Sequence, residues 1–95
     1  MLVLPAELTH AQTTACLRML VQGLRAEAGP QVMVDASALQ HFNSSALALL
    51  LELRREGLAQ GKALALQGMS ARLLDLAALY GVAALLAVPD ALPLK

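Results

Sequence analysis

The chain has 95 residues, and seven acidic residues balance seven basic ones, so its formal net charge is zero. This length indicates one domain, residues 1–95, with a single core and no deep enclosed substrate cavity. A neutral chain without a Lys/Arg cluster or stacking aromatic residues argues against nucleic acid as a partner. The single cysteine, Cys16, excludes an internal disulfide framework, and its apolar neighbours predict a buried thiol in a reducing compartment.

Hydrophobic residues make up 58% of the chain, above the usual share of about 45–50%. The excess predicts an aliphatic core between helices and a sheet, a surface that a partner covers, or both. No apolar run approaches the roughly 18–20 residues of a membrane span. Glu7 and His10 interrupt the apolar start, which argues against a signal peptide. We therefore expect a cytoplasmic protein that reaches a membrane only through another protein.

The first half of the chain predicts a strand, a helix and a second strand. Leu2–Leu4 is apolar and ends before Pro5, which cannot continue a β-ladder. Thr9 is the expected N-cap of a helix over His10–Arg25, whose apolar positions form one stripe. That stripe contains Ala15, Leu17, Leu20, Val21 and Leu24. Gln31–Asp35 is a continuous apolar strand, as expected for a strand that lies centrally or is covered on both faces.

The second half predicts a helix, a third strand and a third helix. The helix over Ser44–Glu56 is followed by a strand over Ala63–Gln67, and Ser70 caps a helix over Ala71–Tyr80. The tail, Val82–Lys95, adds at most one short strand. The alternation of strands and helices predicts an α/β fold in which helices pack on a sheet.

Two hydroxyl groups lie at the start of the predicted helix Ser44–Glu56. Unpaired backbone N–H groups and the helix dipole favour negative charge at this position. Asn43 or Ser44 is expected to cap the helix by accepting a backbone N–H bond, worth about 1 kcal/mol. One polar residue suffices for a cap, so Asn43-Ser44-Ser45 predicts a further role, either a phosphorylatable switch or a docking surface.

The helix that follows offers an apolar flank to this loop. Its predicted core stripe contains Ala46, Leu47, Leu50, Leu53 and Gly57. We expect Ala48 and Leu49 to project sideways from that stripe, near Glu52 and Arg55. Together with the two serines they would form a half-apolar patch suited to a partner helix.

Other chemistry finds little support in the sequence. His10 and His41 lie far apart, and no second cysteine exists, so no metal site is expected. Asp35 ends a strand and could be the acid of a catalytic site, but an Asx-type turn explains it better. Ser44 or Ser45 could join a histidine and Asp35 in a hydrolase triad, yet the G-x-S-x-G pattern is absent. A phosphate-binding loop is absent too, so we expect neither an enzyme nor a cofactor.

The sequence resembles the STAS domain family, the sulfate-transporter and anti-sigma-factor-antagonist fold, over nearly its whole length. Glu7-Leu8-Thr9 looks like the family's entry to its first helix. Val34–Ser37 looks like its strand-end acid, and Phe42–Leu47 looks like its switch loop. The closest similarity is to the MlaB-type subunit of the bacterial Mla phospholipid-transport ABC system. That similarity is carried by Ala46–Leu50, Gln60–Lys62, Leu66–Gly68 and Leu76–Gly81. The resemblance implies a single STAS-type domain with a small mixed β-sheet and helices packed against it.

This resemblance also implies a function. The chain would be a non-enzymatic cytoplasmic module that binds the ATPase subunit of the transporter and supports its assembly or activity, in lipid traffic between bacterial membranes. The family's switch hydroxyl falls on Ser44, with Ser45 beside it. The residues expected at the contact are Asn43, Ser44, Ser45, Ala48, Leu49 and Glu52. An alternative is an anti-sigma-factor antagonist, in which a kinase partner modifies Ser44.

The chain departs from the family's pattern at several positions. Asn43 stands where the family has an acid that belongs to the kinase-recognition loop, and Ala46 stands where it has glycine. The loss of the acid disfavours phosphorylation at Ser44 and favours constitutive docking. The chain also starts later than many relatives, which would leave the Leu2–Leu4 strand exposed or paired with a second copy in a homodimer.

Overall fold

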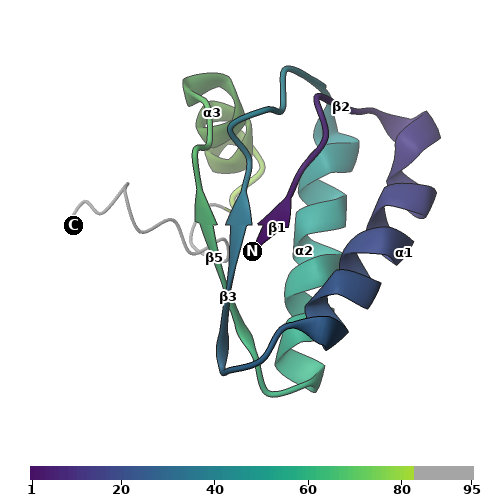
Figure 1. The fold of residues 1–95 in the computed structure, drawn as a ribbon. Helices are drawn as coiled ribbons and strands as arrows, with labels where there is room; N and C mark the ends of the chain where they lie inside the picture. Colours follow the sequence, from purple (N-terminus) through teal and green to yellow (C-terminus); the bar gives the residue numbers. More distant parts are fainter. Residues whose placement is uncertain (83–95) are drawn as a thin grey trace.

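A computed structural model describes residues 1–82, which form an α/β fold (Figure 1). The predicted tail strand would lie in residues 83–95, outside the described part of the chain. The described elements, in chain order, are β1 (Leu2–Val3), β2 (Glu7–Leu8), α1 (His10–Ala26), β3 (Gln31–Asp35), β4 (His41–Phe42), α2 (Ser44–Ala59), β5 (Ala63–Gln67) and α3 (Ala71–Leu79). The predicted α/β class is therefore confirmed, and so is the order of the three predicted strands, seen as β1, β3 and β5, and of the three helices.

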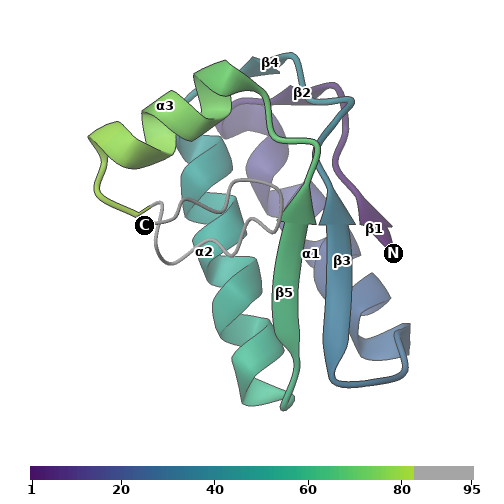
Figure 2. The same cartoon turned by 90° about the vertical axis from the view of Figure 1, so that its left-hand side faces the viewer.

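The main sheet has the strand order β1-β3-β5, and its strands run parallel. Val34 of the central strand is the register partner of Leu2 on one side and of Leu66 on the other. Helices α1 and α2 lie side by side on one face of this sheet, while α3 lies at the β5 side (Figures 1 and 2). Every strand pair in residues 1–82 is parallel, so the mixed strand directions that the resemblance implied are not found in this part.

The core lies between the sheet and the helix pair. In β3, Val32 and Val34 are at most 1% exposed, whereas Gln31 is exposed and Met33 is half-buried. The central position expected for this strand is confirmed, but only its helix-facing side is fully buried. Leu24 of α1 and Leu53 of α2 are fully buried opposite the sheet. Burial of such aliphatic side chains supplies the main stabilisation of a chain this short.

Helix α1 begins as its sequence predicts. The side-chain oxygen of Gln12 accepts hydrogen bonds from the backbone N–H (2.9 Å) and the hydroxyl (2.6 Å) of Thr9, so Thr9 is the N-cap. The predicted apolar stripe was wrong by one position, because Ala15 is exposed and Cys16 is buried instead. Its other members contribute unequally: Leu20 and Leu24 are buried, and Leu17 and Val21 are only half-buried. Burial raises the pKa of the Cys16 thiol, as befits a packed apolar group.

Helix α2 has more buried residues than either of the other two helices. The predicted stripe of Ala46, Leu47, Leu50, Leu53 and Gly57 is buried, as expected. The helix is three residues longer than predicted, since Gly57 lies inside it. A Cβ on Gly57 would lie 3.2 Å from the carbonyl oxygen of Lys62, so the glycine lets the helix end approach the start of β5 closely. Glycine here serves packing and does not end the helix.

Lys62 connects the end of α1 to the start of β5 through hydrogen bonds. Its Nζ donates hydrogen bonds to the backbone carbonyl oxygens of Leu24 (2.6 Å) and Glu27. Helix C-termini leave carbonyl groups without intrahelical partners, and a cation is a favourable partner for them. The lysine therefore contributes to the fold at the end of the molecule away from the starts of α1 and α2.

Helix α3 begins after the N-cap residue that the sequence predicts, Ser70. The Ser70 hydroxyl oxygen accepts a bond from the backbone N–H of Leu73 (3.2 Å), and Leu73 and Ala77 face the core. The helix ends one residue earlier than predicted, at Leu79. Gly81 follows with a positive φ of 71°, the conformation of a left-handed C-terminal cap.

Candidate functional site

A short strand pair places the starts of α1 and α2 next to each other. Strands β2 and β4 are parallel, with Glu7 opposite His41 and Leu8 opposite Phe42. Each helix begins two residues after its strand, at His10 and at Ser44. The two helix N-termini are therefore aligned by the strand register. Neither strand was predicted from the sequence, since each is short and pairs a polar with an apolar residue, without the apolar run that marks Leu2–Leu4.

The start of α2 is an open, polar surface, which we call the α2 entrance (Asn43, Ser44 and Ser45). The Asn43 side-chain oxygen accepts a hydrogen bond from the backbone N–H of Ser45 at 2.9 Å, which confirms a capping residue at this position. Asn43 and Ser44 are exposed, and Ser45 is half-buried. No acidic residue lies in the first turn of α1 or α2. The backbone dipoles of this end are thus not offset by carboxylates of those turns.

Beside the α2 entrance runs a shallow groove between α1 and α2, with a volume of about 250 Å³. The α1–α2 groove is lined by His10, Thr13, Thr14, Leu17, Ser45, Ala48 and Leu49. Ala48 is exposed and Leu17 is half-buried, so the groove has an accessible apolar part. His10 and the hydroxyl groups of Thr13, Thr14 and Ser45 supply its polar part. Of the predicted patch, Ser45, Ala48 and Leu49 line this groove, and α1 supplies the other four lining residues.

The predicted exposure of Leu49 was wrong. It was expected to project sideways and supply exposed apolar area, but it is only 3% exposed and belongs to the core. The reason is geometric: α1 packs against the flank of α2 that the sequence left open, so Leu49 is covered by its neighbour. Leu49 forms the floor of the α1–α2 groove, and Ala48 is the residue of this pair that a partner can reach.

Asp35 forms the Asx-type turn that its position predicted. Its Oδ1 accepts a hydrogen bond from the backbone N–H of Ser37 at 2.9 Å. Hydrogen bonds from the backbone and side chain of Ser37 lower the pKa of the Asp35 carboxyl. Gly68 (φ 73°) packs directly against this turn, because a Cβ there would lie 2.9 Å from the Asp35 carboxylate oxygen. Asp35 thus shapes the loop leading to β4 and does not line the α1–α2 groove.

The strand that leads into the α2 entrance is held from the other side by α3. The Arg72 guanidinium lies 4.8 Å from the centre of the Phe42 ring, a cation–π arrangement, and Nη1 donates to the Gln40 carbonyl oxygen at 3.5 Å. Both contacts are at the surface and each is weak. They place a positive charge beside β4, two residues before Ser44.

The remaining candidates are spread over the surface. Glu52, one turn beyond Ala48 on α2, is half-buried and forms a 3.4 Å ion pair with Arg55. Among residues 1–82, no group of three His, Cys, Asp or Glu side chains is arranged to hold a metal ion. Within the same residues, no helix is both long and apolar enough to cross a membrane. The structure therefore brings Ser45 and Ala48 together with α1, and leaves Glu52 further along α2.

The α1 wall of the groove is the part that sequence reasoning missed. Leu17 was placed in the core stripe, and Thr13 and Thr14 were not considered. A signal did exist, because Thr14, Leu17 and Val21 recur at helical spacing on the edge of the predicted stripe. Such an edge is half-buried in many helices, and only the packing of α1 on α2 shows that it borders a groove.

Comparisons with known proteins agree on one family and one fold. A family model described as "Mlab, STAS domain" matches residues 1–87. No curated protein matches the sequence significantly. An anti-sigma-factor antagonist (STAS) domain protein from Planctomyces limnophilus has a similar structure, with a TM-score of 0.75 at 18% identity, over 90% of this chain and 77% of that chain. The unphosphorylated anti-sigma factor antagonist SpoIIAA gives a TM-score of 0.70 at 19% identity, over 90% and 75%. At such identities the two structures establish the fold alone.

Proposed function

The chain belongs to the STAS domain family, in its MlaB-type group, and from this premise we propose that it is a non-enzymatic interaction module. Its partner would be the ATPase subunit of a Mla-type phospholipid-transport ABC transporter. It would bind this subunit and support its assembly or activity. Through that partner it would be held at the cytoplasmic side of the inner membrane, since its own described helices include no membrane span.

One observation carries the proposal: the α2 entrance is accessible and borders a groove with apolar parts. Ser44 and Ala48 are exposed and Ser45 is half-buried, and Ser45 and Ala48 both line the α1–α2 groove. A shallow surface of this kind suits a protein partner better than a small substrate, which would need a more enclosed site. The Asp35 carboxylate is already bonded to the Ser37 N–H, which supports a structural role and not an acid–base role.

The direct test is co-expression with a tagged ATPase subunit of a Mla-type transporter, followed by affinity capture. Ala48→Asp places a charge beside the α2 entrance and is expected to weaken capture at least about tenfold. Ala59→Asp is the matched control, because Ala59 is also exposed on α2 but lies at its other end. Ser44→Glu is expected to weaken capture too, whereas Ser44→Ala is not. Equal capture of the wild type, Ala48→Asp and Ser44→Glu would contradict this docking surface.

A serine phospho-switch is the second candidate, as in an anti-sigma-factor antagonist. The observation in its favour is the exposed Ser44 hydroxyl in the first turn of a helix without acidic residues there. A phosphate at this position would gain from the helix dipole and the free amides. The test is mass spectrometry after incubation with a neighbouring anti-sigma kinase and ATP. One added phosphate that Ser44→Ala removes and Ser45→Ala retains would support the switch over constitutive docking.

A further inference from the structure

The α1–α2 groove continues along α1 as a second hollow of about 330 Å³. This hollow is lined by Thr14, Leu17, Arg18, Val21, Gln22 and Arg25. Thr14 and Leu17 line both hollows, so the two are continuous. We call the combined surface the extended groove. From His10 to Arg25 it spans roughly 22 Å at about 1.5 Å per helical residue, enough for about four turns of a second helix.

The floor of the extended groove is apolar. Leu17 and Val21 are half-buried and pack against the core from outside. The exposed large hydrophobic residues among residues 1–82 lie elsewhere, at Met1, Val3, Met19, Leu58, Leu79 and Tyr80. The apolar side chains of the groove are thus recessed between polar rims and do not project from the surface. A recessed strip fits an inserted helix, whereas a lipid surface needs projecting apolar side chains.

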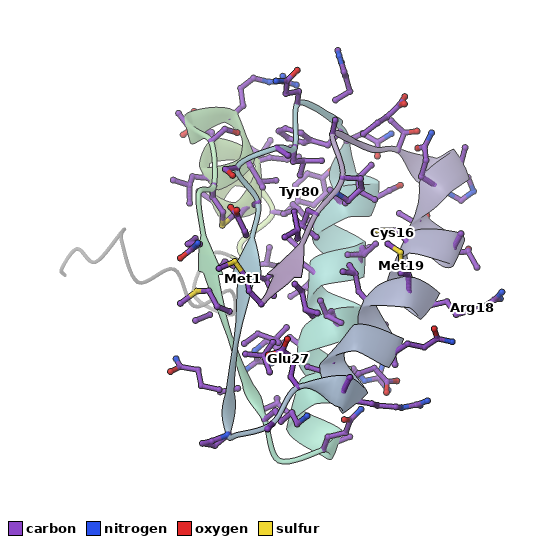
Figure 3. The ribbon with its side chains drawn as sticks, in the orientation of Figure 1. Met1, Cys16, Arg18, Met19, Glu27 and Tyr80 are labelled. Atoms are coloured by element: carbon purple, nitrogen blue, oxygen red, sulfur yellow. The ribbon has the colours of Figure 1, made fainter. Side chains whose placement is uncertain are left out.

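The outer rim of the extended groove is cationic. Arg18 and Arg25 are seven residues apart, two helical turns, so they lie on the same side of α1. Both are exposed, and Figure 3 shows Arg18 extending away from the body of the molecule. Helix α1 contains no Asp or Glu. The nearest acid along the chain, Glu27, is paired with the amino group of Met1 at 2.7 Å.

These charges are available for a partner. Among residues 1–82, neither Arg18 nor Arg25 takes part in an ion pair. On the facing helix, the Glu52 carboxylate is already paired with Arg55 at 3.4 Å. Arg18 and Arg25 are thus the only Asp, Glu, Lys or Arg residues that line the groove in residues 1–82, and both are positive, although the chain as a whole is neutral. A helix that inserts here gains most if it carries carboxylates on the edge facing Arg18 and Arg25.

We propose that the extended groove binds an acidic amphipathic helix of a protein partner. Its apolar face would cover Leu17 and Val21, and its carboxylates would pair with Arg18 and Arg25. This deepens the proposed function, on which it rests for the identity of the partner: the ATPase subunit would hold the domain through such a helix. The binding chemistry itself stands on the groove alone.

The first test needs no natural partner. It uses an 18-residue synthetic amphipathic helix of Leu, Gln and Glu, titrated into the ¹⁵N-labelled full chain and followed by NMR. The expected result is amide shifts concentrated at Thr14, Leu17 and Val21, with affinity falling as salt is raised. A matched peptide with Lys in place of Glu is expected not to bind. No shifts, shifts away from the groove, or equal binding of both peptides would overturn the proposal.

Charge reversal sharpens the test. Arg18→Glu/Arg25→Glu is expected to weaken binding of the glutamate peptide at least about tenfold. The control Arg54→Glu, compared with Arg18→Glu alone, makes the same charge change at a residue that does not line the groove and takes part in no ion pair among residues 1–82. Circular dichroism and urea unfolding check that each variant is folded. Vesicles of phosphatidylglycerol form a separate arm, and binding of vesicles without binding of the glutamate peptide would overturn the choice of a protein helix.

Capture of the ATPase subunit separates this proposal from the proposed function. If the wild-type chain binds the glutamate peptide but does not retain the ATPase, the proposed function fails and the groove proposal stands. If the ATPase is retained equally by the wild type and by Arg18→Glu/Arg25→Glu, and the peptide does not bind, the groove proposal fails and the proposed function stands.

Discussion

Helices α1 and α2 lie side by side on the same face of the sheet, but they use their surfaces differently (Figure 1). Six of the 16 residues of α2 are buried, against three of the 17 residues of α1. Helix α2 therefore holds the core and leaves chiefly its start and its outer side open. Helix α1 lies at the outside and keeps a half-buried edge free along its length. A docking surface at this place needs both: the polar start of one helix and the free edge of the other.

The strongest test of this difference is the same substitution at one groove-lining leucine of each helix. Leu49→Ala removes a side chain that is 3% exposed, so we expect a loss of about 2–5 kcal/mol in the free energy of unfolding. Leu17→Ala trims a half-buried side chain and should cost about 1 kcal/mol. Urea unfolding measures both. Equal losses would show that the two helices share the core more evenly than the structure indicates.

The attachment of α1 provides the next test. Lys62→Met leaves the carbonyl groups of Leu24 and Glu27 without their cationic donor, so we expect a loss of about 1.5–3 kcal/mol. Arg54→Met is the control, because Arg54 makes no hydrogen bond or ion pair among residues 1–82. Hydrogen exchange should also quicken in the last turn of α1 but not in α2. Uniform quickening in both helices would contradict a local fastening.

The cap of α2 should have a smaller effect. Asn43→Ala removes the acceptor for the Ser45 N–H and should cost about 1 kcal/mol. Ser44→Ala should cost only a few tenths of that, since the Ser44 side chain makes no hydrogen bond within the described residues. Thermal or urea unfolding distinguishes the two. A larger loss for Ser44→Ala than for Asn43→Ala would show that Ser44, and not Asn43, caps the helix.

The smallest effect concerns pH. Because the folded state lowers the pKa of Asp35, its hydrogen bonds stabilise the protein above the unfolded pKa of about 4, and this stabilisation is lost as the pH falls through the folded pKa. Asp35→Asn keeps an acceptor for the Ser37 N–H but cannot titrate. We therefore expect a shallower loss of stability on acidification in this variant. Identical acid slopes for the wild type and Asp35→Asn would show that the turn does not contribute.

Much of the fold follows from local rules in the sequence. Thr9, Asn43 and Ser70 are N-caps because short polar side chains precede apolar periodic segments. The first strand stops before Pro5, although it ends at Val3, one residue earlier than predicted. The end of α2 was placed too early because glycine usually marks a helix end. Gly57 instead serves a close approach to Lys62, a contact between segments that local rules do not describe.

The candidate site was predicted only on its α2 side. The α2 entrance was identified from Asn43, Ser44 and Ser45, and the groove beside it depends on which flank of α2 receives α1. That choice buries Leu49 and leaves Ala48 open, although the two are neighbours in the chain. It follows from the short β2–β4 pairing and from helix packing, and neither has a pattern in the sequence that is strong enough to predict.

The pairing of β2 with β4 fixes where each helix begins, and so which side of each helix faces the other. Leu8 and Phe42 are partners, and both helices begin two residues later. One residue inserted between Leu8 and Thr9 would turn α1 by about 100° about its axis. Leu17 would then leave the floor of the groove without any change in its own neighbourhood along the chain. The number of residues between β2 and α1 therefore determines, as much as the side chains do, which residues of α1 line the groove.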